Sequence, residues 1–153
     1  MQALELKIPP VVLVVLFALA MWLVALWLPS VALPPLWGQG LAGVLAGSGI
    51  AVALAGVLAF RRANTTVDPR IPQQTSSLVI RGIYRYSRNP MYLGFLLLLT
   101  ALACYLMSAA AMILLPLFVL YMNRWQIAPE ERYLLEKFGA EYQTYTKQVR
   151  RWF

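Results

Sequence analysis

The sequence predicts an all-α integral membrane protein with about four transmembrane helices, the last two forming a tight hairpin, and a C-terminal cytoplasmic amphipathic helix. Two observations lead to this fold class. Of the 153 residues, 61% are hydrophobic and only 12% are charged, which is more apolar surface than a soluble domain of this size needs. Charged residues are also absent from two long segments, 8–60 and 89–123, where a single crossing takes roughly 20 residues. The length indicates one domain, residues 1–153.

Residues 1–60 are predicted to form two transmembrane helices, at about 9–28 and 38–60. Prolines at positions 29, 34 and 35 separate them, because helices do not continue through such a segment. A cleaved signal peptide is the alternative for the first helix, since residues 30–32 resemble a cleavage site. Its apolar segment is too long and its basic start is only Lys7, so we interpret it as a membrane helix.

Small residues recur at every fourth position of the second helix. They are Gly43, Gly47, Ala51, Ala55 and Ala59. Such a series allows another helix backbone to approach closely. A contact between two copies of the chain is possible, but we expect this face to pack within the bundle.

Residues 61–88 are predicted to be a cytoplasmic loop, because they hold six arginines and one acid, Asp68. The helical hairpin then occupies residues 89–126, as two helices at about 90–107 and 109–125 that turn near Ser108. Asn89 is expected to cap the first of them, with Pro90 at its first position. The hairpin is short for two full crossings, which would leave one leaflet thin and give a lipid tail lateral access.

Residues 127–153 are predicted to form the cytoplasmic C-terminal helix. Pro129, Glu130 and Glu131 are typical of a first helical turn, and Gly139 is expected to mark a bend. Apolar residues recur at steps of three and four along one face. They are Leu134, Phe138, Tyr142, Tyr145 and Val149.

The positive charges predict the topology. Lys7, the arginine-rich loop and the basic tail flank alternate ends of four helices, whereas the other two turns carry no charge. By the positive-inside tendency, both termini and the loop face the cytoplasm of a cell (inner) membrane. The net charge of +7 then reflects loops facing anionic lipid, and we expect no nucleic-acid partner. With no histidine and one cysteine, neither a metal site nor an intramolecular disulfide is expected.

A closed hairpin would bring two distant polar clusters, residues 81–92 and 124–131, to the same membrane face. Arg88, Asn89 and Tyr92 should then lie near Glu130 and Glu131, forming a pocket for a small zwitterionic, partly cationic and aromatic molecule. The alternatives are that the arginines and tyrosines only anchor the chain at the headgroups, and that the two glutamates only complement the helix dipole.

The motifs in the second half of the chain resemble those of the integral-membrane methyltransferases, which include isoprenylcysteine carboxyl methyltransferase and the phospholipid N-methyltransferases. The resemblance covers about residues 65–150. The motifs are Leu78-Val79, Gly82-x-Tyr84, Arg88-Asn89-Pro90-Met91-Tyr92-Leu93-Gly94, Glu130-Glu131 and Phe138-Gly139-x-x-Tyr142-x-x-Tyr145.

The resemblance implies that S-adenosylmethionine is bound from the cytosol and its methyl group is moved to a lipid-like acceptor. The cofactor-binding residues that it implies are Leu78, Val79, Tyr84, Arg88, Asn89, Pro90, Tyr92, Glu130 and Glu131. It also implies catalytic roles for Glu131 and for Arg124, the nearest arginine before the paired glutamates, which is expected to touch the acceptor.

The acceptor stays open between two classes. Asn89 stands where the isoprenylcysteine enzymes usually have histidine, which favours a phospholipid amine. A carboxylate of the isoprenylcysteine type needs no base, which suits a chain without histidine. A non-catalytic four-helix scaffold is a further alternative. A transporter is disfavoured, because no charged residue lies within the predicted spans.

Overall fold

The computed structural model describes residues 5–28, 35–63 and 77–153, and every regular element in these ranges is helical. The break at residues 29–34 and residues 64–76 of the arginine-rich loop, including Asp68, lie outside the described residues. The elements are α1 (Pro10–Trp27), α2 (Pro35–Arg62), the 3-10 turn η3 (Gly82–Arg85), α3 (Pro90–Tyr105), α4 (Ala109–Tyr121), the π-helix η4 (Met122–Ile127) and α5 (Ala128–Gln148).

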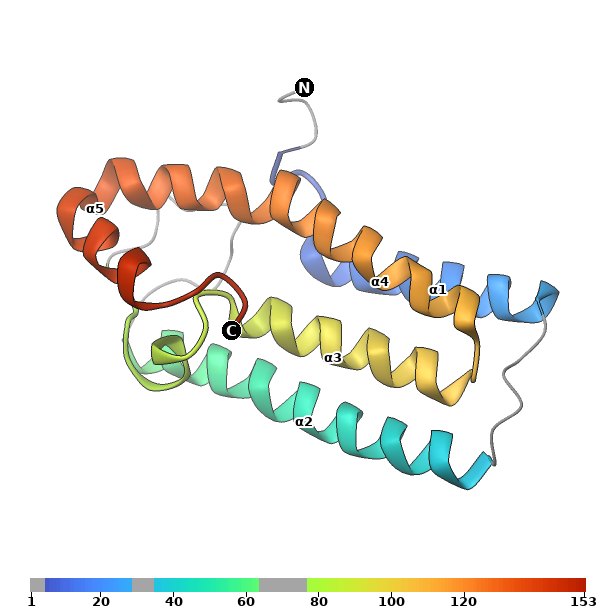
Figure 1. Ribbon diagram of the computed structural model, residues 1–153. Coiled ribbons are helices and arrows are strands. Elements are labelled where there is room, and N and C mark those ends of the chain that lie inside the picture. The colour runs from blue at the N-terminus through green and yellow to red at the C-terminus, as the bar shows by residue number, and fades with distance from the viewer. Residues whose placement is uncertain (1–4, 29–34, 64–76) are drawn as a thin grey trace.

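The long helices run side by side, with α3 between α2 and the pair formed by α1 and α4 (Figure 1). α1, α2 and the continuous helical segment 109–148 are long and apolar enough to cross a membrane, and α3 is a shorter apolar helix. The predicted positions of α1 and α3 are therefore confirmed to within two residues at each end. α2 begins three residues earlier than predicted, because Pro35 is tolerated at a first helical position.

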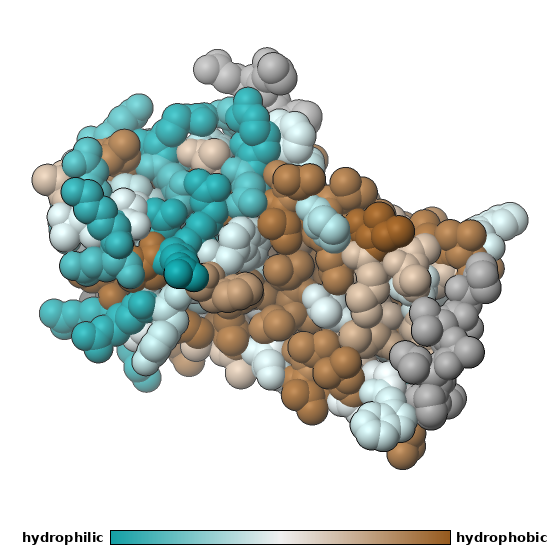
Figure 2. Space-filling model, in the orientation of Figure 1, coloured by the Kyte–Doolittle hydropathy of each residue, from teal (hydrophilic) through white to brown (hydrophobic). Residues whose placement is uncertain are grey.

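Hydrophobic side chains cover the surface along α1 to α4, whereas hydrophilic side chains gather at the end of the molecule that carries α5 (Figure 2). Many of the large apolar residues on the helical surfaces are exposed, among them Val15 and Leu26 of α1 and Val44 of α2. This distribution is the reverse of that in a soluble protein and fits a membrane protein with one polar end.

α4 continues through η4 into α5 without a loop. α5 begins at Ala128 with Pro129 in its first turn, as predicted. The absent N–H of Pro129 falls where the hydrogen-bond pattern changes from π to α, so the proline does not interrupt the path. Gly139 has a non-helical backbone (φ 49°, ψ −120°), which confirms the predicted bend and turns the last part of α5 back toward α3 (Figure 1).

The apolar face predicted for the C-terminal helix is confirmed. Tyr142, Tyr145 and Val149 form a small buried cluster, and Leu134 and Phe138 pack against it together with Leu78 from the loop. The larger core cluster lies among α1, α3, α4 and η4 and includes Phe118 and Met122.

The predicted packing face of α2 is wrong. A side chain at Gly43 or Gly47 would meet nothing within 4 Å, whereas α2 packs on α3 through Gly49 and Gly56. At about 100° per residue, Gly43 and Gly47 lie more than about 100° around the helix from Gly49, so the predicted series starts on a different face. Gly49 and Gly56 are seven positions apart, a drift of only about 20°, so they share one face.

The backbones of α2 and α3 approach closely at Gly49 and Gly94. A Cβ atom at Gly94 would lie 2.7 Å from the carbonyl oxygen of Gly49, and one at Gly49 would lie 2.8 Å from that of Gly94. Because both obstacles are backbone atoms, neither can move aside cheaply. This contact sets the distance between α2 and α3.

We therefore expect Gly94→Ala to lower the free energy of unfolding by about 1–3 kcal/mol, as overpacking of a close contact does. Gly47→Ala is the matched control, because its Cβ would meet open space. Thermal unfolding in detergent measures both. Equal stabilities of the two variants would contradict the close contact.

Candidate functional site

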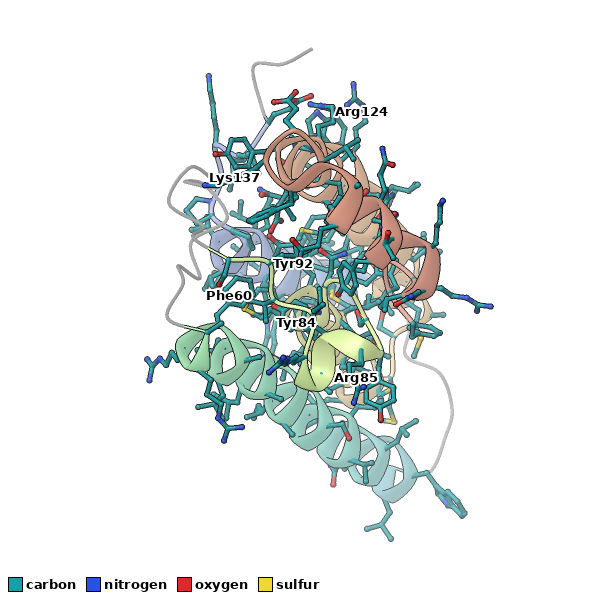
Figure 3. The ribbon with its side chains drawn as sticks, turned by 90° about the vertical axis from the view of Figure 1, so that its left-hand side faces the viewer. Phe60, Tyr84, Arg85, Tyr92, Arg124 and Lys137 are labelled. Carbon is teal, nitrogen blue, oxygen red and sulfur yellow. The ribbon has the colours of Figure 1, made fainter. Side chains whose placement is uncertain are left out.

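The site is centred on a hydrogen bond between α3 and α5. The hydroxyl of Tyr92 donates to Oε2 of Glu130 at 3.1 Å, although the two residues are 38 positions apart in the sequence. Tyr92 is only 4% exposed, and it lies near the centre of the polar end in Figure 3. The predicted meeting of the two polar clusters is thus confirmed, since the α3–α4 turn brings the start of α3 next to the start of α5.

Glu130 lies beyond the apolar part of its helix, at the polar end of the molecule. Burial raises the pKa of its carboxyl from the ordinary value of 4.5 to about 7. The hydrogen bond from Tyr92 opposes this rise, because it favours the charged form, and the adjacent charge of Glu131 adds to it. A carboxyl that titrates near neutral pH is a candidate for binding a cation or for accepting a proton.

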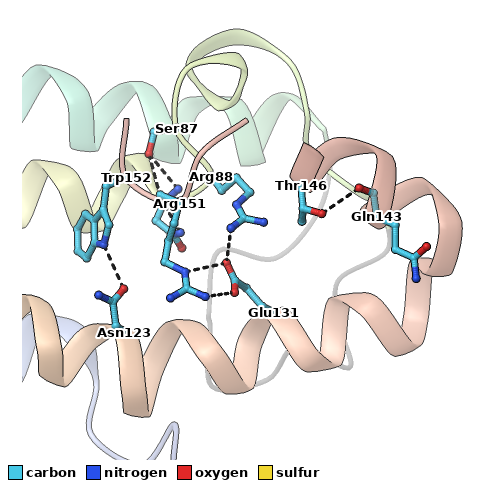
Figure 4. Close-up of polar contacts among 9 residues, drawn as sticks. Ser87, Arg88, Asn123, Glu131, Gln143, Thr146, Arg151 and Trp152 are labelled. Carbon is cyan, nitrogen blue, oxygen red and sulfur yellow. Dashed lines mark hydrogen bonds and ion pairs between the residues drawn. The ribbon is translucent and has the colours of Figure 1, made fainter. Parts of the chain in front are cut away.

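Glu131 is held by two arginines (Figure 4). Its Oε1 lies 3.0 Å from Nη2 of Arg88. Arg151 adds two further bonds, with Nη2 at 2.5 Å from Oε2 and Nε at 3.2 Å from Oε1. The two guanidinium groups together outweigh the single carboxylate, so this trio carries a net positive charge beside Glu130.

Asn89 does not cap α3 with its side chain, contrary to the prediction. Its side-chain amide donates instead to the main-chain carbonyl of Arg151 at 2.9 Å. The side chain of Ser87 accepts the backbone N–H of Asn89 at 3.1 Å, and the backbone N–H of Arg88 donates to the carbonyl of Arg150 at 3.0 Å. The C-terminal residues therefore provide hydrogen-bond acceptors for donors in the segment that leads into α3.

The remaining predicted binding residues lie around this centre. Tyr84 in η3 is 5% exposed. Its ring packs edge-on against Phe60, with 5.3 Å between the ring centroids. Its backbone carbonyl accepts a hydrogen bond from the hydroxyl of Tyr145 at 2.7 Å. Burial, followed by the nearby charge of Glu130, raises the pKa of the Tyr84 hydroxyl, so this group stays protonated. Pro90 is fully buried at the start of α3.

Cavities among the described residues open at this polar end, two of them lined by predicted site residues. One of about 420 Å³ is lined by Arg88, Glu131 and Tyr142, among others. Another of about 550 Å³ is lined by Leu78, Val79 and neighbouring loop residues. Both volumes are in the range of small-molecule sites, and together they place apolar, cationic and acidic groups within one region of the molecule.

Arg124 is not brought into this cluster. It lies at the far side of the polar end from Tyr92 (Figure 3), and its Nη1 is 3.5 Å from Oε1 of Glu5. The same Glu5 carboxylate also binds Arg132 at 2.6 Å. These ion pairs connect the segment before α1 to η4 and α5. The contact of Arg124 with an acceptor stays a prediction.

Arg151 is the residue of the cluster that sequence reasoning missed. It contributes both a guanidinium to Glu131 and a backbone carbonyl to Asn89. The sequence Arg150-Arg151-Trp152 has the same composition as an ordinary interfacial anchor. No spacing within it indicates an inward-facing role, so the sequence held no signal by which Arg151 could have been found.

Comparisons with known proteins bear on residues 37–141. This segment, more than half of the chain, matches the family model described as phospholipid methyltransferase. An uncharacterized protein from Haemophilus influenzae is 47% identical over 62 residues, which are 40% of this chain and 98% of that protein. No solved structure matches the chain.

The hydrogen bond to Glu130 can be tested by Tyr92→Phe, which removes only a hydroxyl. Because that bond lowers the pKa of Glu130, we expect the carboxyl to lose its proton at a higher pH in the variant. Infrared spectroscopy of the protonated carboxyl stretch, compared with Glu130→Gln to assign the band, measures this midpoint.

The matched control is Tyr121→Phe. The hydroxyl of Tyr121 is buried and has no hydrogen-bond partner among the described residues, so its loss should leave the Glu130 midpoint unchanged. If the two variants titrated alike, the Tyr92–Glu130 hydrogen bond would be the wrong account of the site.

Proposed function

Since the chain belongs to the phospholipid methyltransferase family, we propose that it transfers the methyl group of S-adenosylmethionine to a lipid-like acceptor at the membrane surface. The observation that carries the proposal is the contact of Tyr92 with Glu130. It joins the two motifs on which the resemblance to the membrane methyltransferases rests. A scaffold would have no need of a buried carboxyl that titrates near neutral pH.

In this proposal, the groups around Glu130 receive the charged portion of the donor. The ionised carboxylate of Glu130 accepts from the ammonium group or the ribose hydroxyls, and the ring of Tyr92 lies against the sulfonium. Arg88 and Asn89 stand beside them at the start of α3, and Glu131 completes the acidic pair. The apolar surface of the donor pocket is then formed by Leu78, Val79, Tyr84 and Pro90.

Methyl transfer from a sulfonium is an in-line displacement. A lone pair of the acceptor forms the new bond to the methyl carbon, while the electrons of the S–CH₃ bond stay on sulfur. Alignment of donor and acceptor and exclusion of water provide most of what the protein must contribute. A pocket at the membrane surface provides both, since the donor enters from water and the acceptor from lipid.

For the acceptor we propose an amine-bearing lipid, with a carboxylate of the isoprenylcysteine type as the alternative. An amine must lose a proton to attack, and Glu130, with a pKa of about 7, is suited to accept it. A carboxylate acceptor would need no such base. Arg124 and Glu131 are the residues proposed to assist the acceptor.

We also propose a membrane arrangement. α1, α2, α3 and α4 cross the bilayer of a cell (inner) membrane, and both termini, the loop 61–88 and the helix 127–153 face the cytoplasm. The 16 residues of α3 span about 24 Å at 1.5 Å each, less than the ~30 Å hydrocarbon core. The bilayer would thin beside α3, giving a lipid acceptor a lateral path to the site.

We expect the purified protein to bind S-adenosylmethionine, and Glu130→Gln to weaken binding by about tenfold or more, because a charge-assisted hydrogen bond is worth about 1.5–3 kcal/mol. Glu136→Gln is the matched control, since Glu136 is exposed on the same helix. Isothermal titration calorimetry measures both. Absence of binding at millimolar ligand, or equal binding by the two variants, would count against the proposal.

The donor affinity should rise with pH. Below about pH 7 the carboxyl of Glu130 is protonated and neutral, and above it the carboxylate attracts the cationic donor. One unit below the pKa only about a tenth of the carboxyl is ionised, so we expect about tenfold weaker binding at about pH 6 than at about pH 8. Glu130→Gln should abolish this dependence, and a dependence that survives in the variant would assign it to another group.

The acceptor can be identified by transfer of a labelled methyl group into a membrane lipid extract. An N-methyl product keeps its label in mild base, as the amine proposal requires. Release of the label as methanol would show a methyl ester and support the carboxylate alternative. Absence of transfer to any lipid, with donor binding intact, would contradict a lipid-like acceptor.

A further inference from the structure

The five C-terminal residues, 149–153, cross back over the candidate site after α5 ends at Gln148. We call them the C-terminal strap. In Figure 1 this part of the chain returns from the far end of α5 to the start of α3. It is thereby placed between the two helices whose Tyr92 and Glu130 meet.

The strap contacts the segment before α3 through its backbone. The carbonyl of Arg150 accepts the N–H of Arg88 at 3.0 Å, and the carbonyl of Arg151 accepts the side-chain amide of Asn89 at 2.9 Å. The side chain of Arg151 turns the other way and binds both carboxylate oxygens of Glu131 on α5 (Figure 4). Arg151 thus connects the residue before α3 with α5.

The two residues that Arg151 holds are next to the centre of the site. Glu131 follows Glu130 directly, and Asn89 lies three positions before Tyr92, within one helical turn. A planar guanidinium bound at two atoms fixes both the distance and the angle of its partner. The position of Arg151 therefore constrains how closely Tyr92 approaches Glu130.

We propose that Arg151 is a positioning residue, which holds Asn89 and Glu131, and through them Tyr92 and Glu130, in the geometry that receives the methyl donor. This inference rests on the proposed function. It gives Arg151 no contact with the donor and no part in the chemical step. It assigns to the C-terminal strap the arrangement of the pocket.

Trp152 separates this role from simple anchoring. Its ring packs against the large core cluster, and its Nε1 donates to Oδ1 of Asn123 at 3.1 Å. The side chain of Arg151, by contrast, is 36% exposed. An ion pair this accessible to water adds little to the free energy of unfolding. Loss of the Arg151 side chain should therefore disturb the site more than the fold.

The test uses the full chain in detergent, with the variants Arg151→Ala and Arg151→Lys. Arg150→Ala is the control, because Arg150 enters the strap contacts through its backbone carbonyl, which the substitution keeps. We expect Arg151→Ala to weaken S-adenosylmethionine binding about tenfold with little change in Tm. Arg151→Lys should restore part of it, because lysine keeps the charge but not the two-atom grip, and Arg150→Ala should bind as the unchanged protein does.

A second measurement does not depend on the donor. Arg151→Lys keeps the positive charge beside Glu131 but not the two-atom grip, so a shift of the infrared titration midpoint of Glu130 in this variant reports a change in geometry rather than the loss of a charge. An unchanged midpoint, or wild-type donor affinity in Arg151→Ala, overturns the positioning role. Failure of the unchanged protein to bind S-adenosylmethionine is a different result: it rejects the proposed function, and the donor-binding role of the strap with it.

Discussion

Two adjacent carboxylates at the start of α5 must be held against the start of α3, and the polar end of this protein is built around that requirement. Glu130 takes a hydrogen bond from Tyr92, whereas Glu131 is enclosed by Arg88 and Arg151. An uncompensated buried charge would be costly. Tyr92 on α3, Arg88 just before α3 and Arg151 in the C-terminal strap supply the compensating groups. The pair of glutamates on α5 therefore ties these three parts of the chain together.

The apolar part of the molecule supports this arrangement at a distance. The close backbone contact between Gly49 and Gly94 sets α2 against α3, and the helical path from α4 through η4 into α5 carries the glutamates back to the start of α3. Because no loop interrupts that path, the direction of α4 determines where Glu130 lies. The site thus depends on helix packing as much as on its own polar contacts.

Much of the fold could be predicted from the sequence, because hydropathy and prolines report directly on membrane helices, and hairpin closure required Tyr92 and Glu130 to meet. Other features have no such signature. The π-helix η4 has no distinctive composition, and the α2–α3 contact depends on helical phase, which a series of small residues does not give. Arg151 reaches Asn89 through a backbone carbonyl, which every residue has, and its guanidinium reaches Glu131 across 20 positions of sequence with no spacing that marks the contact. That same carbonyl draws the Asn89 amide away from the capping position that the sequence predicts.

The most direct test of the account is to locate the donor on the protein. With S-adenosylmethionine carrying a ¹³C-labelled methyl group bound to the protein in lipid nanodiscs, nuclear Overhauser contacts report the side chains nearest to that methyl. The account predicts contacts with the ring of Tyr92 and with residues at the start of α5. Contacts only with the apolar cavity at the opposite end, where Trp37 and Met107 lie, would contradict it.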